Sequence, residues 1–239
     1  MDFNKFKVHF HPSWYSKIKP FIESEECDKI YAFLKAESKK GVKVAPISMH
    51  LWKCFKETPL NEVKVIMMGI SPYSGFKDDA PIADGLLLGC SVTEQLHPSL
   101  HRFYNAIEKE FYNGFNLDYV KNTNVDYLTE QGVLMLNASL TTEMDKEGAH
   151  LEIWEPFIKY LFEHILNDLG VPIIFIGKES AKCKQYTTDL SHTFELKDLN
   201  SDSYGFVEWD TEGVFTKVNE LLYETNGFNV EWLDVDLPF

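Results

Sequence analysis

The stretch that decides the fold is VLMLNASLT (Val133–Thr141). Its first four residues are apolar, and a run of this length between polar neighbours is typical of a fully buried strand. The run stops at Asn137. Similar short runs occur at KVIMM (Lys64–Met68) and PIIFI (Pro172–Ile176), and HTFEL (His192–Leu196) indicates a fourth short strand. The sequence therefore predicts four short strands, at least one of which ends on a polar side chain.

Amphipathic stretches separate these runs. Apolar residues at near-helical spacing predict helices over Trp14–Lys39 (broken around Pro20), Ser99–Phe111, Glu155–Leu169, Ser180–Leu190 and Phe215–Tyr223. Helices that alternate with strands indicate a doubly wound parallel sheet. We therefore expect an α/β fold with three layers (α/β/α) around a central four-stranded parallel sheet. The chain shows neither a repeat nor a linker, so residues 1–239 are expected to form a single domain.

In a sheet of this kind, ligands bind outside the carboxyl ends of the strands. The segments of interest are those that directly follow a strand: Gly69–Gly75, Asn137–Thr142, Gly177–Ser180 and Lys197–Gly205. Each one, taken alone, is also explained by turn or helix-cap chemistry, because glycine, proline, asparagine and serine are common in both.

Composition limits the classes of function. The chain has 23 Lys and Arg against 37 Asp and Glu, which gives a formal net charge of −14. This balance argues against a protein that coats nucleic acid non-specifically, since such binding depends on many basic residues. It leaves room for a small basic face. Lys178, Lys182 and Lys184 are the best candidates for such a face, although a solvated helix surface explains them equally well.

The scattered cysteines and histidines predict neither a disulfide framework nor a metal site. No C-x-x-C pair and no H-E-x-x-H spacing occurs in the sequence. We expect reduced, buried thiols, no metal and no cofactor. The amino-terminal stretch MDFNKFKVHFHPSWY has no apolar signal core, and the apolar runs are too short to cross a bilayer. A cytoplasmic protein without membrane contact, most simply a monomer, is the expectation.

The order of the motifs resembles that of family 1 uracil-DNA glycosylases over nearly the whole chain. GISPYSG (Gly69–Gly75) stands where the family has its water-activating G-Q-D-P-Y-H-G loop, and VLMLNASLT matches the uracil-reading strand L-L-L-N-x-x-L-T. Further matches are VAPISMHLWKCF (Val44–Phe55), HPSLHRFYNAIEKEF (His97–Phe111), IWEPF (Ile153–Phe157), IIFIGKESAKC (Ile173–Cys183) and FTKVNELL (Phe215–Leu222). The resemblance implies a uracil-DNA glycosylase fold.

The resemblance also implies roles for particular residues. A glycosylase flips a nucleotide out of the stack and reads the edge of its base in a pocket. Asn137 matches the base-reading asparagine, whose amide offers both a donor and an acceptor. Tyr73 matches the tyrosine that screens the C5 side of the base. DNA itself, with a flipped-out pyrimidine nucleotide, is the implied partner.

The departures from the family pattern fall on its chemistry. Ser71 replaces the catalytic Asp of the first loop, Ile70 replaces Gln, and Ser74 replaces His. Leu88 stands in place of the Phe on the pocket floor. The late H-P-S-P-L-S loop, with its anion-stabilising His and wedging Leu, is replaced by DLNSDSYGF (Asp198–Phe206). The segment FKDDAPIAD after Gly75 is longer than its family counterpart. We therefore expect weak or no activity on plain uracil, because such electrostatic groups contribute about 3–4 kcal/mol each to catalysis.

These considerations give a set of candidate site residues. As catalytic residues we expect Asp84, Ser71 and Asn200. Asp84 would supply the missing carboxylate from the segment that follows the first loop, as the resemblance to other branches of the superfamily implies. A structural role for Asp84 is an equal alternative. The expected base-binding residues are Asn137, Tyr73, Ile70, Ser74 and Leu88. The expected DNA-binding residues are Pro46, Ser48, Lys178, Ser180, Ser201 and Ser203.

Three hypotheses for the function remain open. The first is a monofunctional glycosylase for a modified or atypical pyrimidine, such as a bulky base of phage DNA, which would suit a role in antiviral defence. The second is an inactive glycosylase-fold protein that binds DNA or a replication or repair partner. The third is an acidic decoy for a DNA-binding protein. Retention of Asn137 and Tyr73 favours the first, although Tyr73 opposes a bulky C5 substituent unless its ring turns aside.

Overall fold

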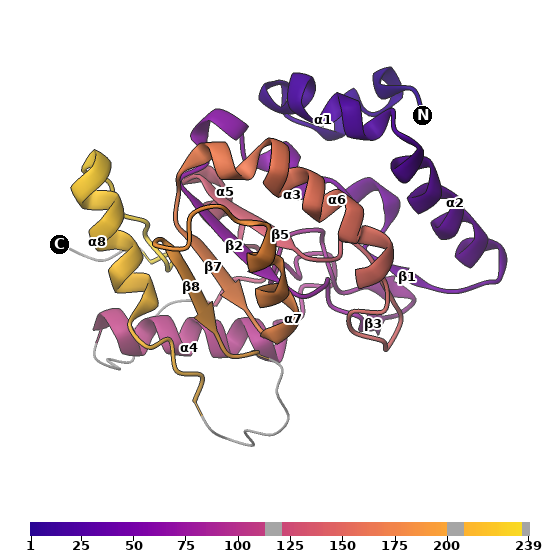
Figure 1. Ribbon diagram of the computed structural model, residues 1–239. Helices are drawn as coiled ribbons and strands as arrows, with labels where there is room; N and C mark the ends of the chain where they lie inside the picture. Colours follow the sequence, from indigo (N-terminus) through magenta and orange to yellow (C-terminus); the bar gives the residue numbers. More distant parts are fainter. Residues whose placement is uncertain (113–120, 200–207, 236–239) are drawn as a thin grey trace.

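A computed structural model describes residues 1–112, 121–199 and 208–235 (Figure 1). Its central sheet contains β2 (Val65–Gly69), β5 (Val133–Asn137), β7 (Ile173–Ile176) and β8 (Thr193–Leu196), in the order β5-β2-β7-β8. All neighbouring strands of this sheet are parallel. The predicted α/β fold around a four-stranded parallel sheet is confirmed, and the predicted strand bounds differ from the observed ones by at most one residue.

Helices cover both faces of the sheet (Figure 1). The described helices are α1 (Tyr15–Ile22), α2 (Glu25–Lys39), α3 (Lys53–Glu57), α4 (Pro98–Tyr112), α5 (Asp126–Glu130), α6 (Leu151–His164), α7 (Lys178–Ala181) and α8 (Val214–Asn226). The helix α6 lies on one face with α1 and α2 packed behind it, while α4 and α8 lie towards the other.

Aromatic side chains fill the core on each side of the sheet. Trp52 contacts both Trp154 and Phe157 edge-to-face, with ring centroids 5.7 and 5.3 Å apart. Phe103 of α4 meets Phe215 of α8 in the same way at 5.7 Å. Large buried rings remove much apolar surface from water, and such pairs add a further contribution of about 0.5–1.5 kcal/mol. These contacts fix the helices on the sheet and so hold the strand ends in place.

Short two-stranded sheets lie at the carboxyl edge of the central sheet. The pair β1 (Val44–Ala45) and β6 (Thr142–Glu143) is antiparallel, as is the hairpin of β3 (Phe76–Lys77) and β4 (Ala80–Pro81). The hairpin is built from the segment that is longer than its family counterpart. Asp78 and Asp79 at its tip have φ of 49° and 67°, the left-handed values that a two-residue hairpin turn requires. Both are exposed, so they form a solvated turn.

Several predicted helix bounds differ from the observed ones. The break expected around Pro20 lies instead between α1 and α2, and Pro20 is inside α1. The helix α6 begins at Leu151 and ends at His164, and a 3-10 turn, Leu166–Leu169, follows it up to Gly170 in the left-handed conformation. The expected helix Ser180–Leu190 is shorter, because α7 passes into a 3-10 helix, Lys182–Tyr186. The four cysteines are buried and unbonded, as predicted. None of the described helices is long and apolar enough to cross a membrane.

Candidate functional site

The carboxyl ends of the parallel strands converge on one hollow. Gly69 and Ile70 at the end of β2 line it, as do Ile176 at the end of β7 and Asp198 and Leu199 after β8. The remaining lining residues are Ser71, Tyr73, Leu87, Leu88, Ser99 and Glu147. The hollow has a volume of about 30 Å³, which is room for about two water molecules. In its present form the hollow is small.

Asn137 lies at the end of β5, next to the lining residue Gly69 but outside the set of residues that line the hollow. It pairs in register with Gly69, and a β-carbon on Gly69 would lie 3.0 Å from Oδ1 of Asn137. Asn137 is only 3% exposed, and its Oδ1 has no hydrogen-bond partner among the described residues. A buried acceptor without a donor costs about 1–3 kcal/mol. The site therefore contains a polar group that an incoming N–H donor would satisfy.

Tyr73 is buried and stacks on His97. The two ring centroids lie 3.7 Å apart at an interplanar angle of 25°. Burial raises the pKa of Tyr73 well above its usual value, so the phenol stays protonated. Burial also lowers the pKa of His97 to about 4, so the imidazole is neutral at physiological pH. The pair forms a flat, uncharged wall beside the hollow.

Ile70 crosses the hollow between two glycines. A β-carbon on Gly177 would lie 3.0 Å from Cδ1 of Ile70, and one on Gly148 would lie 3.6 Å from its Cγ2. Because both neighbours lack side chains, the branched Ile70 fits between them. Its placement in the pocket wall, together with the small volume of the hollow, makes Ile70 the side chain that most directly limits entry of a base.

Leu88 lines the hollow with its neighbour Leu87, which the sequence did not single out. Leu88 has φ of 63°, a conformation that is uncommon for a residue other than glycine. The Leu87 N–H donates to the Met135 carbonyl at 3.1 Å, which ties this segment to β5. Ser74, a further expected base-binding residue, is half-buried and lies outside the set of lining residues.

Ser71 reaches the hollow, but its hydroxyl is already engaged. The oxygen accepts from the Gly148 N–H at 3.0 Å and donates to the Pro72 carbonyl at 3.2 Å. These bonds connect the first loop with the segment that precedes α6. They favour a structural role, while a catalytic role for Ser71 stays a prediction.

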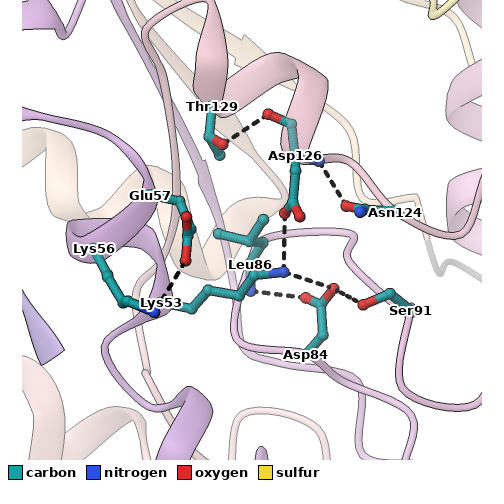
Figure 2. A network of polar contacts seen from close by, with 9 residues as sticks. All are labelled: Lys53, Lys56, Glu57, Asp84, Leu86, Ser91, Asn124, Asp126 and Thr129. Atoms are coloured by element: carbon teal, nitrogen blue, oxygen red, sulfur yellow. Dashed lines mark hydrogen bonds and ion pairs between the residues drawn. The ribbon is translucent and has the colours of Figure 1, made fainter.

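Asp84 lies in a buried network rather than in the lining of the hollow (Figure 2). It is 1% exposed, and its Oδ1 accepts from the Leu86 N–H at 3.1 Å. Its Oδ2 accepts from the Ser91 hydroxyl at 2.6 Å and lies 3.2 Å from Nζ of Lys53. Nζ of Lys53 also lies 2.9 Å from Oδ1 of Asp126. Both carboxylate oxygens of Asp84 therefore serve to hold the loop that bears Leu87 and Leu88.

The charge of Lys53 is stabilised within this network. Burial alone would lower the pKa of Lys53, but the carboxylates of Asp84 and Asp126 outweigh it and raise that pKa. The ammonium therefore stays charged opposite Asp84. These contacts favour the structural alternative for Asp84, and its catalytic role stays a prediction.

The expected DNA-binding residues fall into exposed and buried groups. Ser48 and Lys178 are exposed, whereas Pro46 is buried. Ser180 is fully buried, and its hydroxyl donates to the carbonyls of Ile176 and Gly177, so this side chain does not face solvent. Ser201 and Ser203 lie outside the described residues, as does Asn200, the third expected catalytic residue.

The basic patch expected near Gly177 is partly neutralised. Lys182 pairs with Glu179 at 2.6 Å, and Lys184 with Glu195 at 2.7 Å. Lys178 remains the exposed lysine at the start of α7. Contacts of these residues with phosphate stay predictions.

Two acidic residues at the hollow were missed as candidates. Glu147 is exposed and follows the β6 turn, while Asp198 is half-buried two residues beyond the end of β8. Asp198 falls within the strand-end segment 197–205 that the sequence marks as important. Its place in that segment could have identified Asp198 from the sequence. Glu147 lies on a loop outside the strand-end segments, so no such sequence signal pointed to it.

Comparison with known proteins relates this arrangement to one superfamily. No protein-family model matches the chain. A uracil-DNA glycosylase of Streptococcus pyogenes serotype M49 (strain NZ131) is 29% identical over 228 residues, which span 93% of this chain and 99% of the relative.

Solved structures show the same fold. The crystal structure of mimivirus uracil-DNA glycosylase superposes with a TM-score of 0.79 at 21% identity, covering 95% of this chain and 88% of the other. The corresponding enzyme structure from Nitratifractor salsuginis gives 0.58 at 19% identity, covering 95% and 96%. With the strand-end hollow described, the chain is similar in sequence to uracil-DNA glycosylases over most of its length and shares the fold of their solved structures.

Proposed function

We propose that this protein is a DNA glycosylase that hydrolyses the N-glycosidic bond of a flipped-out pyrimidine nucleotide and leaves an abasic site. We propose further that its preferred base is modified or atypical, and that plain uracil is a poor substrate. The carrying observation is the buried Oδ1 of Asn137, which has no donor among the described residues. An N–H on the edge of a pyrimidine supplies that donor.

The environment of Asn137 supports selection of a base by shape as well as by hydrogen bonding. The apolar side chains of Ile70, Leu87 and Leu88 line the hollow next to it. A flat base gains from burial against such surfaces, at about 25 cal/mol per Å². Ile70 and Leu88 replace the family's Gln and Phe, so the hydrogen bonds and the stacking that favour uracil differ here.

The chemistry of the first loop supports weak activity on plain uracil. Ser71 stands where the family has its catalytic Asp, and its hydroxyl bonds to Gly148 and Pro72. A neutral hydroxyl in this position offers little stabilisation to a cationic sugar. Loss of one preorganised electrostatic group typically costs about 10²–10³-fold in rate.

Cleavage of defined duplexes tests the proposal. Labelled duplexes with a single uracil, thymine, 5-hydroxymethyluracil, 5-formyluracil or 5-methylcytosine are incubated with the protein and treated with alkali, which breaks the strand at an abasic site. Genomic DNA from phages with modified pyrimidines extends the range of bases. We expect breaks with at least one modified base, weaker breaks with uracil, and none with Asn137→Ala. Absence of breaks with every DNA would refute the glycosylase proposal.

A second candidate is an inactive glycosylase-fold protein that binds DNA or a replication or repair partner. The engaged hydroxyl of Ser71 favours it, because this loop then has a structural use without chemistry. Electrophoretic mobility shifts with the same duplexes distinguish the two candidates. Retained binding of a modified duplex without any break would support the second.

A further inference from the structure

We infer that Asp198 supplies the carboxylate that the first loop has lost, and that it acts on the sugar cation and the attacking water. The inference rests on the proposed glycosylase function and adds to it a catalytic residue on a different loop. The family's motif places this carboxylate in the loop after β2, whereas we place it at Asp198, after β8.

The position of Asp198 is the first support. The residue lies two positions after β8 and lines the hollow together with Ile70 and Ser71. A β-carbon on Gly177 would lie 3.3 Å from Oδ2 of Asp198 and 3.0 Å from Cδ1 of Ile70. Its carboxylate therefore lies at the junction of the β2 and β7 ends, next to the residue that follows Gly69.

A second, independent observation points to a ligand in the same hollow. Asn137 is more than nine-tenths buried, and its Oδ1 has no partner among the described residues while it lies next to the pocket-lining Gly69. A base that donates to Asn137 lies deep in the hollow. Its sugar then lies towards the more exposed rim, where Asp198 and Glu147 are found.

Other oxygens near the first loop are less suited to the task. Asp84 holds the 84–91 segment through Leu86, Ser91 and Lys53, and it lies outside the lining. Glu147 shares the rim but is exposed, where water weakens its field. Asp198 is half-buried, so its charge acts more strongly on a cation that forms next to it.

The proposed step balances as a hydrolysis. The bond between C1′ of the sugar and the base nitrogen breaks, and its electron pair leaves with the base. The Asp198 carboxylate stabilises the resulting positive charge on the sugar. The oxygen of one water molecule then bonds to C1′, its proton passes to the carboxylate and from there to bulk water, and the base anion takes up one proton from bulk water. The products are an abasic sugar and a neutral base.

The first test compares Asp198→Asn with a matched control, Asp168→Asn. Asp168 lies on the 3-10 turn after α6, and its side chain is 77% exposed. Single-turnover cleavage is measured on whichever modified duplex the wild-type protein cuts. We expect Asp198→Asn to lower the rate by about 10²–10³-fold and Asp168→Asn to leave it unchanged. A rate for Asp198→Asn within about threefold of wild type would overturn the inference.

A folding control accompanies this comparison. Thermal unfolding of Asp198→Asn and of a second variant, Asp198→Ser, reports whether the fold survives. Because Asp198 lies beyond the sheet, we expect both midpoints to stay near that of the wild type. Loss of cleavage in variants that unfold like the wild type supports the inference, whereas loss that only follows unfolding contradicts it.

A binding experiment separates this inference from the proposed function. The probes are two duplexes, one with a cationic pyrrolidine ring in place of the sugar and one with a neutral tetrahydrofuran ring. We expect the wild type to prefer the cationic probe by roughly tenfold, and Asp198→Asn to lose that preference. If the wild type cuts no DNA, the proposed function fails, and this experiment still decides the placement of the carboxylate. Equal preference in wild type and variant would overturn it.

Discussion

A β-carbon on Gly177 would lie 3.3 Å from Oδ2 of Asp198. Gly177 has φ of 90°, so the chain turns sharply at the end of β7 and leaves space that the carboxylate and Ile70 occupy. The lack of a side chain at Gly177 is thus a condition for the shape of the hollow.

Gly177→Ala should lower both stability and cleavage. The backbone of Gly177, with φ of 90° and ψ of 154°, costs about 1–3 kcal/mol for alanine, and the new methyl group would also displace Ile70 or Asp198. Chemical unfolding and single-turnover cleavage measure the two effects. The control is Gly170→Ala, which has φ of 61° with nothing within 4 Å of its β-carbon. It should show a smaller loss of stability with normal cleavage, because its methyl group meets no neighbour. Equal cleavage by both variants would contradict the argument.

Asn137→Ala should abolish base recognition with little loss of stability. The substitution removes a buried acceptor without a partner, and this gain of about 1–3 kcal/mol offsets the small cavity that it leaves. Thermal unfolding and cleavage are measured together. The contrast is Asn219→Ala, because Asn219 donates to the Val230 carbonyl and accepts from the Val230 and Trp232 N–H groups. Asn219→Ala should destabilise the protein by about 1–3 kcal/mol. Equal losses of stability in both variants would argue against an unsatisfied Asn137.

Lys53→Met should destabilise the protein by about 3 kcal/mol, because it leaves the carboxylate of Asp84 buried without its cation. The free energy of unfolding measures this. The double variant Lys53→Met with Asp84→Asn should recover part of the loss. Lys56→Met is the control, since the Lys56 side chain is 58% exposed, and it should change stability by less than about 0.5 kcal/mol. A Lys53→Met protein as stable as the wild type would show that the network contributes little.

Stability should fall as the pH drops from about 6.5 to about 4. In the unfolded chain, His97 takes up a proton near its ordinary pKa of about 6.5, whereas in the folded protein burial lowers that pKa to about 4. Within this window the unfolded state binds more protons, so the free energy of unfolding decreases. Burial lowers the pKa of His50 and His150 as well, and these add to the same trend.

Comparison of the wild type with His97→Gln measures how much His97, which stacks on Tyr73, contributes to this pH dependence of stability. The variant should show a shallower loss of stability between these two pH values. An imidazole resonance of His97 that titrates near pH 6.5 in the folded protein would disprove the assignment.

Ile70→Ala should widen the range of bases that the protein accepts. The side chain stands between Gly148 and Gly177 in a hollow of about 30 Å³, so its removal creates space without a change of backbone. Cleavage of duplexes with small and bulky pyrimidines is compared for wild type and variant. A larger relative gain with the bulky base is expected. Leu60→Ala, a partly buried change outside the pocket lining, is the control for general loosening.

The main features of the fold follow from local patterns. Short apolar runs that lead into Gly69, Asn137 and Gly177 predict three of the strands, because buried parallel strands are apolar on both faces. The fourth strand, β8, lies at the sheet edge and is only partly buried. The same rule directs attention to the strand ends, where Asn137 and Ile70 do lie. Helix ends were less predictable, since the last turn of a helix is often 3-10 and sequence patterns do not mark the change, as at Lys182–Tyr186 after α7.

The placement of carboxylates could not be predicted in the same way. Asp84 stands in a segment next to the pocket, but the direction of its side chain depends on Lys53, 31 positions away, and on the Ser91 hydroxyl. Glu147 and Asp198 meet at one hollow only because two loops from different strands converge there. Sequence spacing does not predict which loops converge, beyond the rule that the carboxyl ends of parallel strands lie at one edge of the sheet.

The unpaired oxygen of Asn137 has a practical consequence for identifying the substrate. A free base that satisfies it binds the folded state alone, and such a ligand at one hundred times its dissociation constant raises stability by about 2.7 kcal/mol. A panel of soluble nucleobases, scored by the rise in melting temperature, would therefore reveal the preferred chemical edge without DNA, strand cleavage or a working active site. The melting temperature of the protein would then report which base it prefers.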